Sequence, residues 1–231
     1  MDLELSVVLA SPLFCGIEEG EARSMLQCLS ARTVEYGKGQ TVLEAGETVS
    51  SVGLVLSGRF CVVREDYWGR RDLLAQLGPG ELFAESFACV PGAPLTVSVT
   101  ADAAGAVLFL DVGRVMGICP SACPFHARLL RNLLAVLARK NLGMNEKLTH
   151  MARRTTREKL LSYLSAQAAR RGSARFDIPF DRQALADYLA VDRSAMSAEL
   201  GKLRREGVID FHRERFEMKT SEGPTENGGP Q

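Results

Sequence analysis

Short apolar runs separated by glycines fill the chain from residue 33 to residue 110, and this pattern predicts a series of short β-strands. Turn glycines such as Gly46, Gly58, Gly69 and Gly80 stand between the runs. Strands this short, with a glycine turn after each, indicate an antiparallel roll or sandwich rather than a parallel sheet with crossover helices. The predicted strands are Thr41–Leu43, Gly53–Leu56, Arg59–Arg64, Asp72–Gln76, Thr96–Thr100 and Ala106–Leu110.

A different spacing begins at Phe125, where apolar residues recur at alternating steps of three and four as far as Met151. This heptad spacing predicts one long helix whose apolar seam packs against a second copy of the chain. A single polar residue, Asn141, lies in the seam, and one Asn at such a position fixes register and partner number. The predicted dimer seam is Leu130, Leu134, Leu137, Asn141, Met144 and Leu148. A helix packed only on its own roll would need a narrower apolar face, so we expect both contacts: Leu129, Leu133 and Val136 pack on the roll, and the seam packs on a partner chain.

Signals for helix starts recur in the last third of the chain. Thr155 and Glu158 have the spacing of a capping box, and Asp181 and Asp192 each precede a short amphipathic run. Two helices separated by three residues, followed by two strands, form the pattern of a winged helix-turn-helix. The strands of this predicted wing are Val208–Phe211 and Arg215–Met218.

These patterns together predict an α+β protein in four parts. Residues 1–118 form an antiparallel β-roll with the role of a sensor, and residues 119–152 form the long dimerisation helix. Residues 153–219 form the winged helix-turn-helix domain. Residues 220–231 contain mainly Gly, Pro, Glu, Asn and Thr, so they lack apolar surface to bury and are expected to be disordered.

The formal net charge of zero conceals an uneven distribution. Residues 153–219 contain 15 Lys and Arg against 10 Asp and Glu, whereas residues 1–152 contain 13 against 16. A basic last third indicates that this part contacts a polyanion. No run approaches the ~18 apolar residues of a membrane span, and the run Leu5–Ala10 lacks a positive flank. We therefore expect a cytoplasmic protein with no membrane contact.

The second helix of the predicted helix-turn-helix exposes its first turns to the major groove of double-stranded DNA. Arg193 has the geometry to donate two hydrogen bonds to a guanine, and hydroxyl side chains near it can contact bases or phosphates. Two positions depart from the motif, because Ala190 replaces a common glycine and Glu199 replaces an apolar residue. The expected base-facing residues are Arg193, Ser194, Ser197 and Ala198, and the expected phosphate contacts are Arg157, Lys202, Arg204, Arg205, Arg213 and Arg215. Arg182 is also expected to bind DNA.

Four segments in order resemble the catabolite-activator and fumarate–nitrate-regulator (Crp/Fnr) family of transcription factors. They are Tyr36–Gly46, Val55–Val63, Leu77–Glu85 and Arg182–Ile209. The resemblance covers the whole chain before the tail, and it implies a cyclic-nucleotide-binding-like roll, a homodimer and a palindromic DNA site. It also makes RNA polymerase a candidate partner, and it leaves open whether the protein activates or represses.

In the cyclic-nucleotide-binding members of that family, a Glu binds the ribose and an Arg followed by Ser or Thr holds the phosphate. Glu85 and Thr96 match two of these places, but Leu95 stands at the place of the arginine. A buried phosphate would lack its cation there, so we predict an effector other than a cyclic nucleotide, or a pocket that stays empty. The expected pocket residues are Glu85, Leu95, Thr96, Phe83, Met144 and Asn145.

Cysteines near the start of the long helix raise a second hypothesis for the signal. Cys119, Cys123 and His126, joined by Cys89, offer ligands for zinc, an iron–sulfur cluster or haem. The alternatives are thiols buried as small hydrophobes, or a reversible disulfide or sulfenic acid without metal. The identity of the cofactor therefore stays open at the level of sequence.

Two other classes of protein were weighed. An enzyme of the metal-dependent roll type needs inward-pointing histidines, but His126, His150 and His212 all lie outside the predicted roll. The sequence also lacks a P-loop and a dinucleotide fingerprint, so we predict no catalysis. The other rival is a cyclic-nucleotide-binding-like signalling module whose C-terminal helices bind protein rather than DNA.

Overall fold

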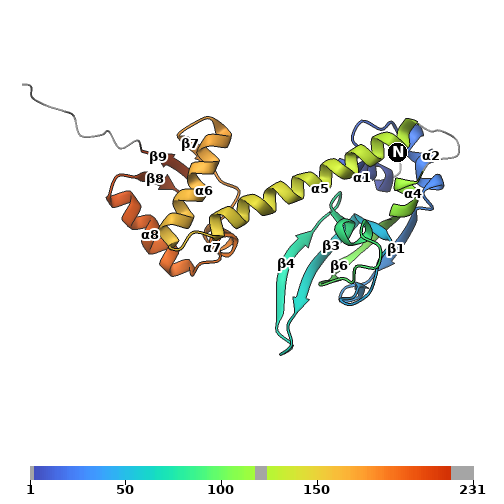
Figure 1. Ribbon diagram of the computed structural model, residues 1–231, viewed down its shortest axis with the longest axis horizontal. Helices are drawn as coiled ribbons and strands as arrows, with labels where there is room; N and C mark the ends of the chain where they lie inside the picture. Colours follow the sequence, from blue (N-terminus) through green and yellow to red (C-terminus); the bar gives the residue numbers. More distant parts are fainter. Residues whose placement is uncertain (1–2, 118–123, 220–231) are drawn as a thin grey trace, which may run out of the picture. The chain divides into compact units, whose positions relative to one another are not determined.

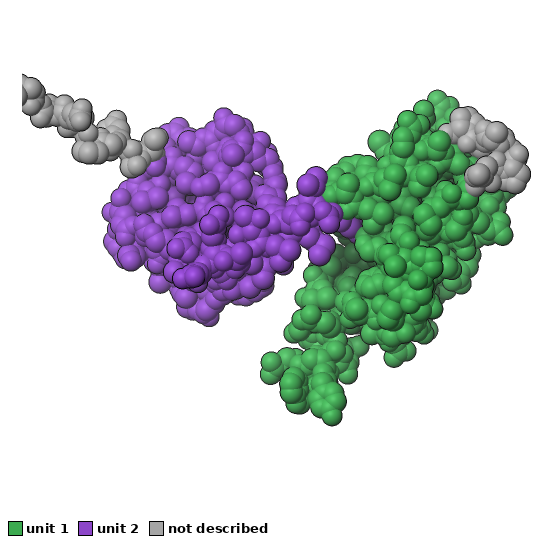
Figure 2. All heavy atoms as spheres, in the orientation of Figure 1, with its two compact units in different colours: residues 1–139 green, residues 140–231 purple. Residues whose placement is uncertain are grey.

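The structure of the chain is a computed structural model that describes residues 3–117 and 124–219. It divides into two compact units, residues 1–139 and 140–231 (Figures 1 and 2). The division lies inside the long helix α5 (Pro124–Met151), whose bounds confirm the helix predicted from Phe125 to Met151. The four-part division of the sequence stays a prediction.

The first unit contains one antiparallel sheet with strand order β1-β6-β3-β4, and β2 and β5 pair with β6 and β3 respectively. Side chains from several strands, among them Phe60, Val99 and Phe109, form a core inside this roll. The architecture confirms the predicted antiparallel β-roll. The strands are β1 (Arg32–Tyr36), β2 (Thr41–Leu43), β3 (Ser51–Glu65), β4 (Arg71–Leu77), β5 (Leu82–Phe83) and β6 (Ser98–Asp111).

Two pairs of predicted strands are single long strands, because their central glycines bend a strand instead of ending it. Gly58 lies within β3 with φ +79°, and Gly105 lies opposite within β6. A Cβ at Gly105 would stand 2.1 Å from the carbonyl oxygen of Ser57, so the two backbones approach as only glycine allows. The register shifts on both sides of Gly58, which marks an irregular, strongly bent crossing of the two strands.

The hairpin between β3 and β4 has an ordered turn with an aromatic tip. The Asp66 carboxylate accepts hydrogen bonds from the backbone N–H groups of Trp68 and Arg70, both at 2.9 Å. Tyr67 and Trp68 are 95% and 85% exposed, and their rings lie edge to face. The turn is therefore held by its own backbone while both rings extend into solvent.

Helices cover the roll and share a second core with it. The α5 residues Leu129, Leu133 and Val136 are buried among side chains of the roll and the N-terminal helices, which confirms the predicted roll-facing side. The Asn132 amide donates to the carbonyl oxygens of Leu13 and Cys15, each at 2.9 Å. The other helices of this unit are α1 (Leu3–Ala10), η1 (Pro12–Phe14), α2 (Glu19–Cys28), α3 (Glu85–Ala88) and α4 (Val112–Met116).

The second unit joins three helices to a three-stranded sheet of order β7-β9-β8 around one apolar core. The Thr155 hydroxyl and the Glu158 carboxylate form the predicted capping box, and Gly172 ends that helix in the left-handed conformation. Strands β8 and β9 pair as the predicted wing. The elements are α6 (Thr156–Arg171), β7 (Arg175–Asp177), α7 (Arg182–Leu189), α8 (Arg193–Arg205), β8 (Ile209–His212) and β9 (Arg215–Met218). Of the helices in the described ranges, none combines the length and apolar character that crossing a bilayer requires.

Candidate nucleic-acid interface

Helices α7 and α8 form the helix-turn-helix, and each starts at an aspartate that caps it. The Asp181 carboxylate accepts from the backbone N–H of Ala184, and the Asp192 carboxylate accepts from that of Ala195, both at 2.8 Å. Such caps stabilise a helix by about 1 kcal/mol each. The two caps therefore define the residues at which α7 and α8 begin.

The turn between the helices is held by Lys159, a residue that the sequence analysis did not single out. Ala190 adopts the left-handed conformation, with φ +49° and ψ +61°, which costs a non-glycine residue roughly 1–2 kcal/mol. The Lys159 ammonium, on α6, donates to the carbonyl oxygens of Leu189 and Ala190, both at 3.2 Å. These bonds bind the turn to α6, and they show how the motif accommodates an alanine at the usual glycine position.

The base-facing residues predicted from sequence lie together on the exposed side of α8. Arg193, Ser194, Ser197 and Ala198 are all exposed, while Met196 on the opposite side is fully buried in the core. Within residues 3–117 and 124–219, Arg193 makes no ion pair. An uncompensated guanidinium at the start of an exposed helix has the chemistry for guanine or phosphate recognition. Lys202, which the sequence predicts to contact a phosphate, is exposed as well.

A hollow of about 390 Å³ brings the start of α7 and the tip of the wing next to Arg193. Its lining includes Arg182, Gln183, Arg193 and Arg213, and the last is exposed without an ion pair among the described residues. Gln183 was not expected from the sequence. Its amide donates to the Asp187 carboxylate at 2.9 Å. Asp181 and Glu214 line the same hollow, which therefore gathers three arginines, two carboxylates and an amide, and among the described residues Arg193 and Arg213 make no ion pair.

Arg157 has other partners than the phosphates predicted for it. Its guanidinium donates to the carboxylates of Glu199 at 3.1 Å and Glu206 at 2.6 Å. These hydrogen bonds raise the pKa of Arg157, and the bond from Arg157 lowers the pKa of Glu206. The polar residue at position 199, which departs from the motif, is thereby paired with a cation from α6. A phosphate-contacting role for Arg157 stays a prediction.

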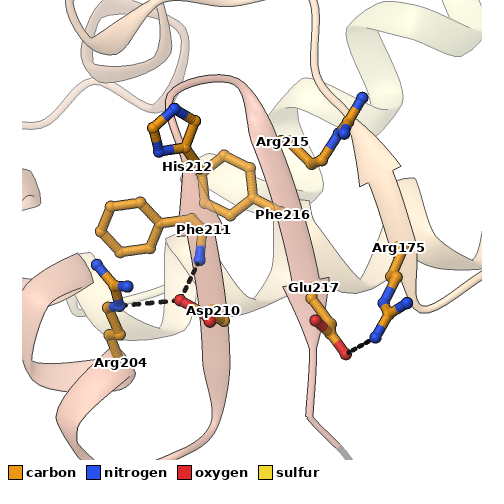
Figure 3. Close-up of a pocket in the computed structure, with 8 residues that line it drawn as sticks. All are labelled: Arg175, Arg204, Asp210, Phe211, His212, Arg215, Phe216 and Glu217. Atoms are coloured by element: carbon orange, nitrogen blue, oxygen red, sulfur yellow. Dashed lines mark hydrogen bonds and ion pairs between the residues drawn. The ribbon is translucent and has the colours of Figure 1, made fainter.

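The outer face of the wing sheet is rich in charge, and Figure 3 shows two of its ion pairs, Arg204–Asp210 and Arg175–Glu217. It borders a separate hollow of about 370 Å³. Arg204 pairs with Asp210 at 2.9 Å, Arg175 pairs with Glu217 at 3.1 Å, and Arg215 pairs with Asp177 at 3.2 Å. Lys219 also pairs with Glu217, at 3.7 Å, so each of these four cations lies beside a carboxylate.

The predicted effector residues of the first unit differ in where their side chains lie. Phe83 is buried edge to face against Phe109, with ring centroids 6.3 Å apart, and Glu85 is 5% exposed at the start of α3. Leu95 is 3% exposed, whereas Thr96 is exposed. The position of the family's phosphate-binding arginine therefore holds a buried apolar side chain.

The remaining two effector candidates belong to the other unit. Met144 and Asn145 are exposed on α5, and the Asn145 side-chain amide donates to the Oδ1 atom of Asn141 at 3.0 Å. Whether these residues serve the pocket of the first unit stays a prediction.

The metal hypothesis is only partly covered by the structure, because Cys119 and Cys123 lie outside the described residues. His126 is 8% exposed, and its Nδ1 atom has no hydrogen-bond partner among the described residues. Burial raises the pKa of the Cys89 thiol, and Glu85 raises it further, so this sulfur is a weak nucleophile. Across residues 3–117 and 124–219, no group of three or more ligating side chains is assembled.

The predicted dimer seam presents apolar surface that the single chain leaves open. Leu134 is 57%, Met144 is 65% and Leu148 is 60% exposed, and Asn141 is exposed between them. Leu130 and Leu137 are half-buried. Large exposed apolar side chains at heptad spacing are typical of a helix that pairs with another.

Comparison with known proteins finds a family model that matches each of the two units. The family model described as "Cyclic nucleotide-binding domain" matches residues 33–121, and the one described as "Crp-like helix-turn-helix domain" matches residues 158–222. The chain is 26% identical over 200 residues to the "Transcriptional activator protein FnrL" of Cereibacter sphaeroides, covering 80% of this chain and 75% of that protein.

Two further similarities extend over most of the chain. It is 22% identical over 204 residues to the "CRP-like cAMP-activated global transcriptional regulator" of Mycobacterium tuberculosis, covering 88% of this chain and 90% of that protein. The crystal structure of Thermus thermophilus catabolite activator protein is 25% identical, with a TM-score of 0.53, covering 90% of this chain and 94% of that one.

Proposed function

The chain belongs to the Crp/Fnr family of DNA-binding transcription regulators, and we propose that it acts as a homodimer on a palindromic DNA site under the control of its first unit. This is a family of regulators, not of enzymes. The observation that carries the proposal is the convergence of Arg193 and Arg213, both without ion pairs in the described chain, on one hollow beside α8.

In the proposed complex, the exposed side of α8 enters the major groove. Arg193 donates two hydrogen bonds to a guanine, and Ser194 and Ser197 contact bases or phosphates beside it. Arg213, at the tip of the wing, contacts the phosphate backbone and contributes affinity without sequence preference. The protein acts where the DNA is, which is the cytoplasm, and RNA polymerase is the proposed partner at the promoter.

Dimerisation would bury the exposed apolar seam of α5. Pairing through Leu134, Met144 and Leu148 removes from water the side chains that the single chain leaves more than half exposed. A two-fold dimer presents two copies of α8, so the DNA site would be a palindrome with half-sites ~34 Å apart. Exchange of Asn141 for Leu tests the register-setting role, because sedimentation and DNA affinity should both change.

The signal is proposed to reach the first unit as something other than a cyclic nucleotide. The buried Leu95 offers no cation to a phosphate, whereas the relative from Mycobacterium tuberculosis is named as cAMP-activated. An effector that binds two states of the dimer unequally would shift the balance between them. Titration of the protein with cAMP, followed by calorimetry, should give no heat of binding.

A metal or redox signal is the alternative, and it rests on Cys119, Cys123, His126 and Cys89. Anaerobic purification followed by a visible spectrum and metal analysis tests it. A stoichiometric metal or chromophore that disappears in the Cys119→Ser/Cys123→Ser variant would support this alternative. A colourless, metal-free protein would direct the search to small molecules around Glu85 and Leu95.

The central experiment selects duplex sites from a random library with the full-length protein and then measures affinity against salt concentration. We expect a palindromic consensus and a steep linear fall of log K with log salt, with a slope of roughly −0.9 for each phosphate contacted. A chain that binds no duplex, or binds with no dependence on salt, would contradict the proposal. That result would favour a signalling module whose last helices bind protein.

A further inference from the structure

We propose that Arg182 is a positioning residue that fixes the wing against the helix-turn-helix, and that it does not itself contact DNA. This inference rests on the proposed DNA-binding function. It concerns the first residue of α7, which the sequence predicts to bind DNA. The contacts of its guanidinium within the protein carry the argument.

The guanidinium of Arg182 lies over two aromatic rings and donates a hydrogen bond to a backbone carbonyl. Its Cζ atom lies 4.8 Å from the centre of the Phe211 ring and 5.2 Å from that of Phe216, on the two wing strands. Its Nη2 atom donates to the carbonyl oxygen of Arg213 at 3.0 Å, at the turn of the wing. A planar cation can stack on a ring and donate in its own plane at once, which an ammonium cannot do.

Phe211 lies close to two guanidinium groups, that of Arg182 on the first helix and that of Arg204 near the end of the second. The Arg204 Cζ atom lies 5.4 Å from the Phe211 ring centre, and Arg204 also pairs with Asp210. Phe211 in turn stacks on Phe216, which stacks on Phe176, at one register of the three-stranded sheet. Both helices of the motif therefore meet the wing at a single ring.

The turn that Arg182 holds is one that needs support. Arg213 has φ +53°, a left-handed conformation that residues with a Cβ adopt at a cost. The hydrogen bond to its carbonyl oxygen, with that from Ile178 N–H to Glu214 O at 2.9 Å, stabilises the turn in this conformation. The result is an exposed Arg213 side chain at the hollow that it shares with Arg193.

Arg182 is poorly placed to serve a phosphate as well. Burial lowers the pKa of its guanidinium, and Glu214 nearby raises it, so the group is charged yet partly removed from water. Its stacking on two rings and its bond to Arg213 O would have to break before it could reach DNA. Arg213 and Arg193 have no such partners in the described chain.

The test compares Arg182→Lys with Phe211→Leu and with Arg213→Ala in the full-length protein. Lysine keeps the charge but loses the stacking plane, so affinity for the selected duplex should fall about tenfold. Because the Arg213 side chain would no longer be held toward the phosphate backbone, the magnitude of the slope of log K against log salt should also decrease by about 0.9. Arg213→Ala should then cost little more in the Arg182→Lys background, and Phe211→Leu should not add to Arg182→Lys.

A measurement without DNA makes the inference independent of the binding assay. Amide hydrogen exchange at residues 211–216 should be faster in Arg182→Lys than in the parent protein. Arg175→Lys is the matched control, because Arg175 is an exposed, ion-paired arginine of the same sheet, and its exchange and affinity should match the parent.

Two results would overturn the inference. One is unchanged exchange in the wing of Arg182→Lys. The other is an Arg182→Lys variant that retains affinity and salt slope while Arg213→Ala adds its full cost, as expected if Arg182 contacts a phosphate directly. Failure of the parent protein to bind duplex would instead refute the proposed function, and the exchange data would still decide the role of Arg182.

Discussion

The second unit presents two arginine-bearing faces that differ in how their charge is compensated. On the outer face of the wing, Arg175, Arg204 and Arg215 each lie within 3.2 Å of a carboxylate oxygen. On the side of the helix-turn-helix, Arg193 and Arg213 make no ion pair with any described residue. The comparison teaches that a nucleic-acid surface is identified by uncompensated charge and not by the number of basic residues.

Among the substitutions that test this comparison, loss of Arg193 should weaken DNA binding the most. Arg193→Ala should weaken binding to the selected duplex by about 10- to 100-fold and relax the preference at one guanine, because a bidentate contact contributes roughly 1–3 kcal/mol. Arg215→Ala, on the paired face, should change affinity by less than about twofold. Fluorescence anisotropy with matched and single-base-altered duplexes measures both. Equal losses in the two variants would refute the distinction between the faces.

Arg157 tests whether a paired cation serves stability instead of binding. In Arg157→Gln, the carboxylates of Glu199 and Glu206 lose their counter-charge, so the second unit should unfold at a lower temperature. The slope of DNA affinity against salt should stay that of the parent, because no phosphate contact is removed. Calorimetry and salt titration provide the two readouts. A slope of log affinity against log salt that is smaller in magnitude by about one would show that Arg157 contacts a phosphate.

The outer face can be turned into a cationic one to test the comparison in reverse. Glu217→Gln leaves Arg175 and Lys219 without their shared carboxylate. Affinity for duplex of unrelated sequence should then rise by roughly twofold to fivefold at low salt, since the face gains one unit of net positive charge and two cations lose their carboxylate partner. Affinity for the selected site should change by a smaller factor. No gain at low salt would show that this face lies away from DNA.

Two histidines of the second unit differ in burial. The change in stability with pH that follows from this difference is the smallest of the expected effects. His150 is 2% exposed and its Nδ1 lies 2.8 Å from the Ser162 hydroxyl, whereas His212 is exposed on the wing. Burial lowers the pKa of His150, Glu146 raises it, and Arg153 and Arg170 lower it. The folded protein thus takes up this proton less readily than the unfolded chain, whose histidine pKa is about 6.5.

The consequence is a loss of stability as the pH falls below about 6.5, which continues down to the pKa of the folded state. Urea unfolding of the full chain between about pH 5 and 7.5, above the range of ordinary carboxylates, measures the change. His150→Phe should flatten this dependence. A His150→Phe variant with the parent's pH profile would show that other groups are responsible.

Local signals in the sequence predicted much of the fold. The caps at Thr155, Asp181 and Asp192 depend on residues three positions apart, so they could be found from sequence alone, and all three are present. The long helix was predicted because its apolar period persists from Phe125 to Met151. Glycine was a less reliable guide: Gly58 lies inside a strand, where a partner backbone passes close by.

Contacts between residues far apart in the chain could not be predicted from the sequence. Arg157 meets Glu199 42 residues later, and Arg182 meets the carbonyl of Arg213 31 residues later. Such contacts depend on how helices and wing pack, and no local pattern carries that information. Basic residues of the last third therefore looked equivalent in the sequence, and the structure separates them by their partners.

The tip of the β3–β4 hairpin gives the protein an optical property of its own. Trp68 is the single tryptophan of the chain and is 85% exposed. Excitation near 295 nm therefore reports on one turn of the first unit, with red-shifted emission in water. Any molecule that covers this turn will shift the emission to shorter wavelengths, whereas duplex held only by the second unit will leave it unaltered. A label-free titration can thus separate events at the hairpin from events on DNA.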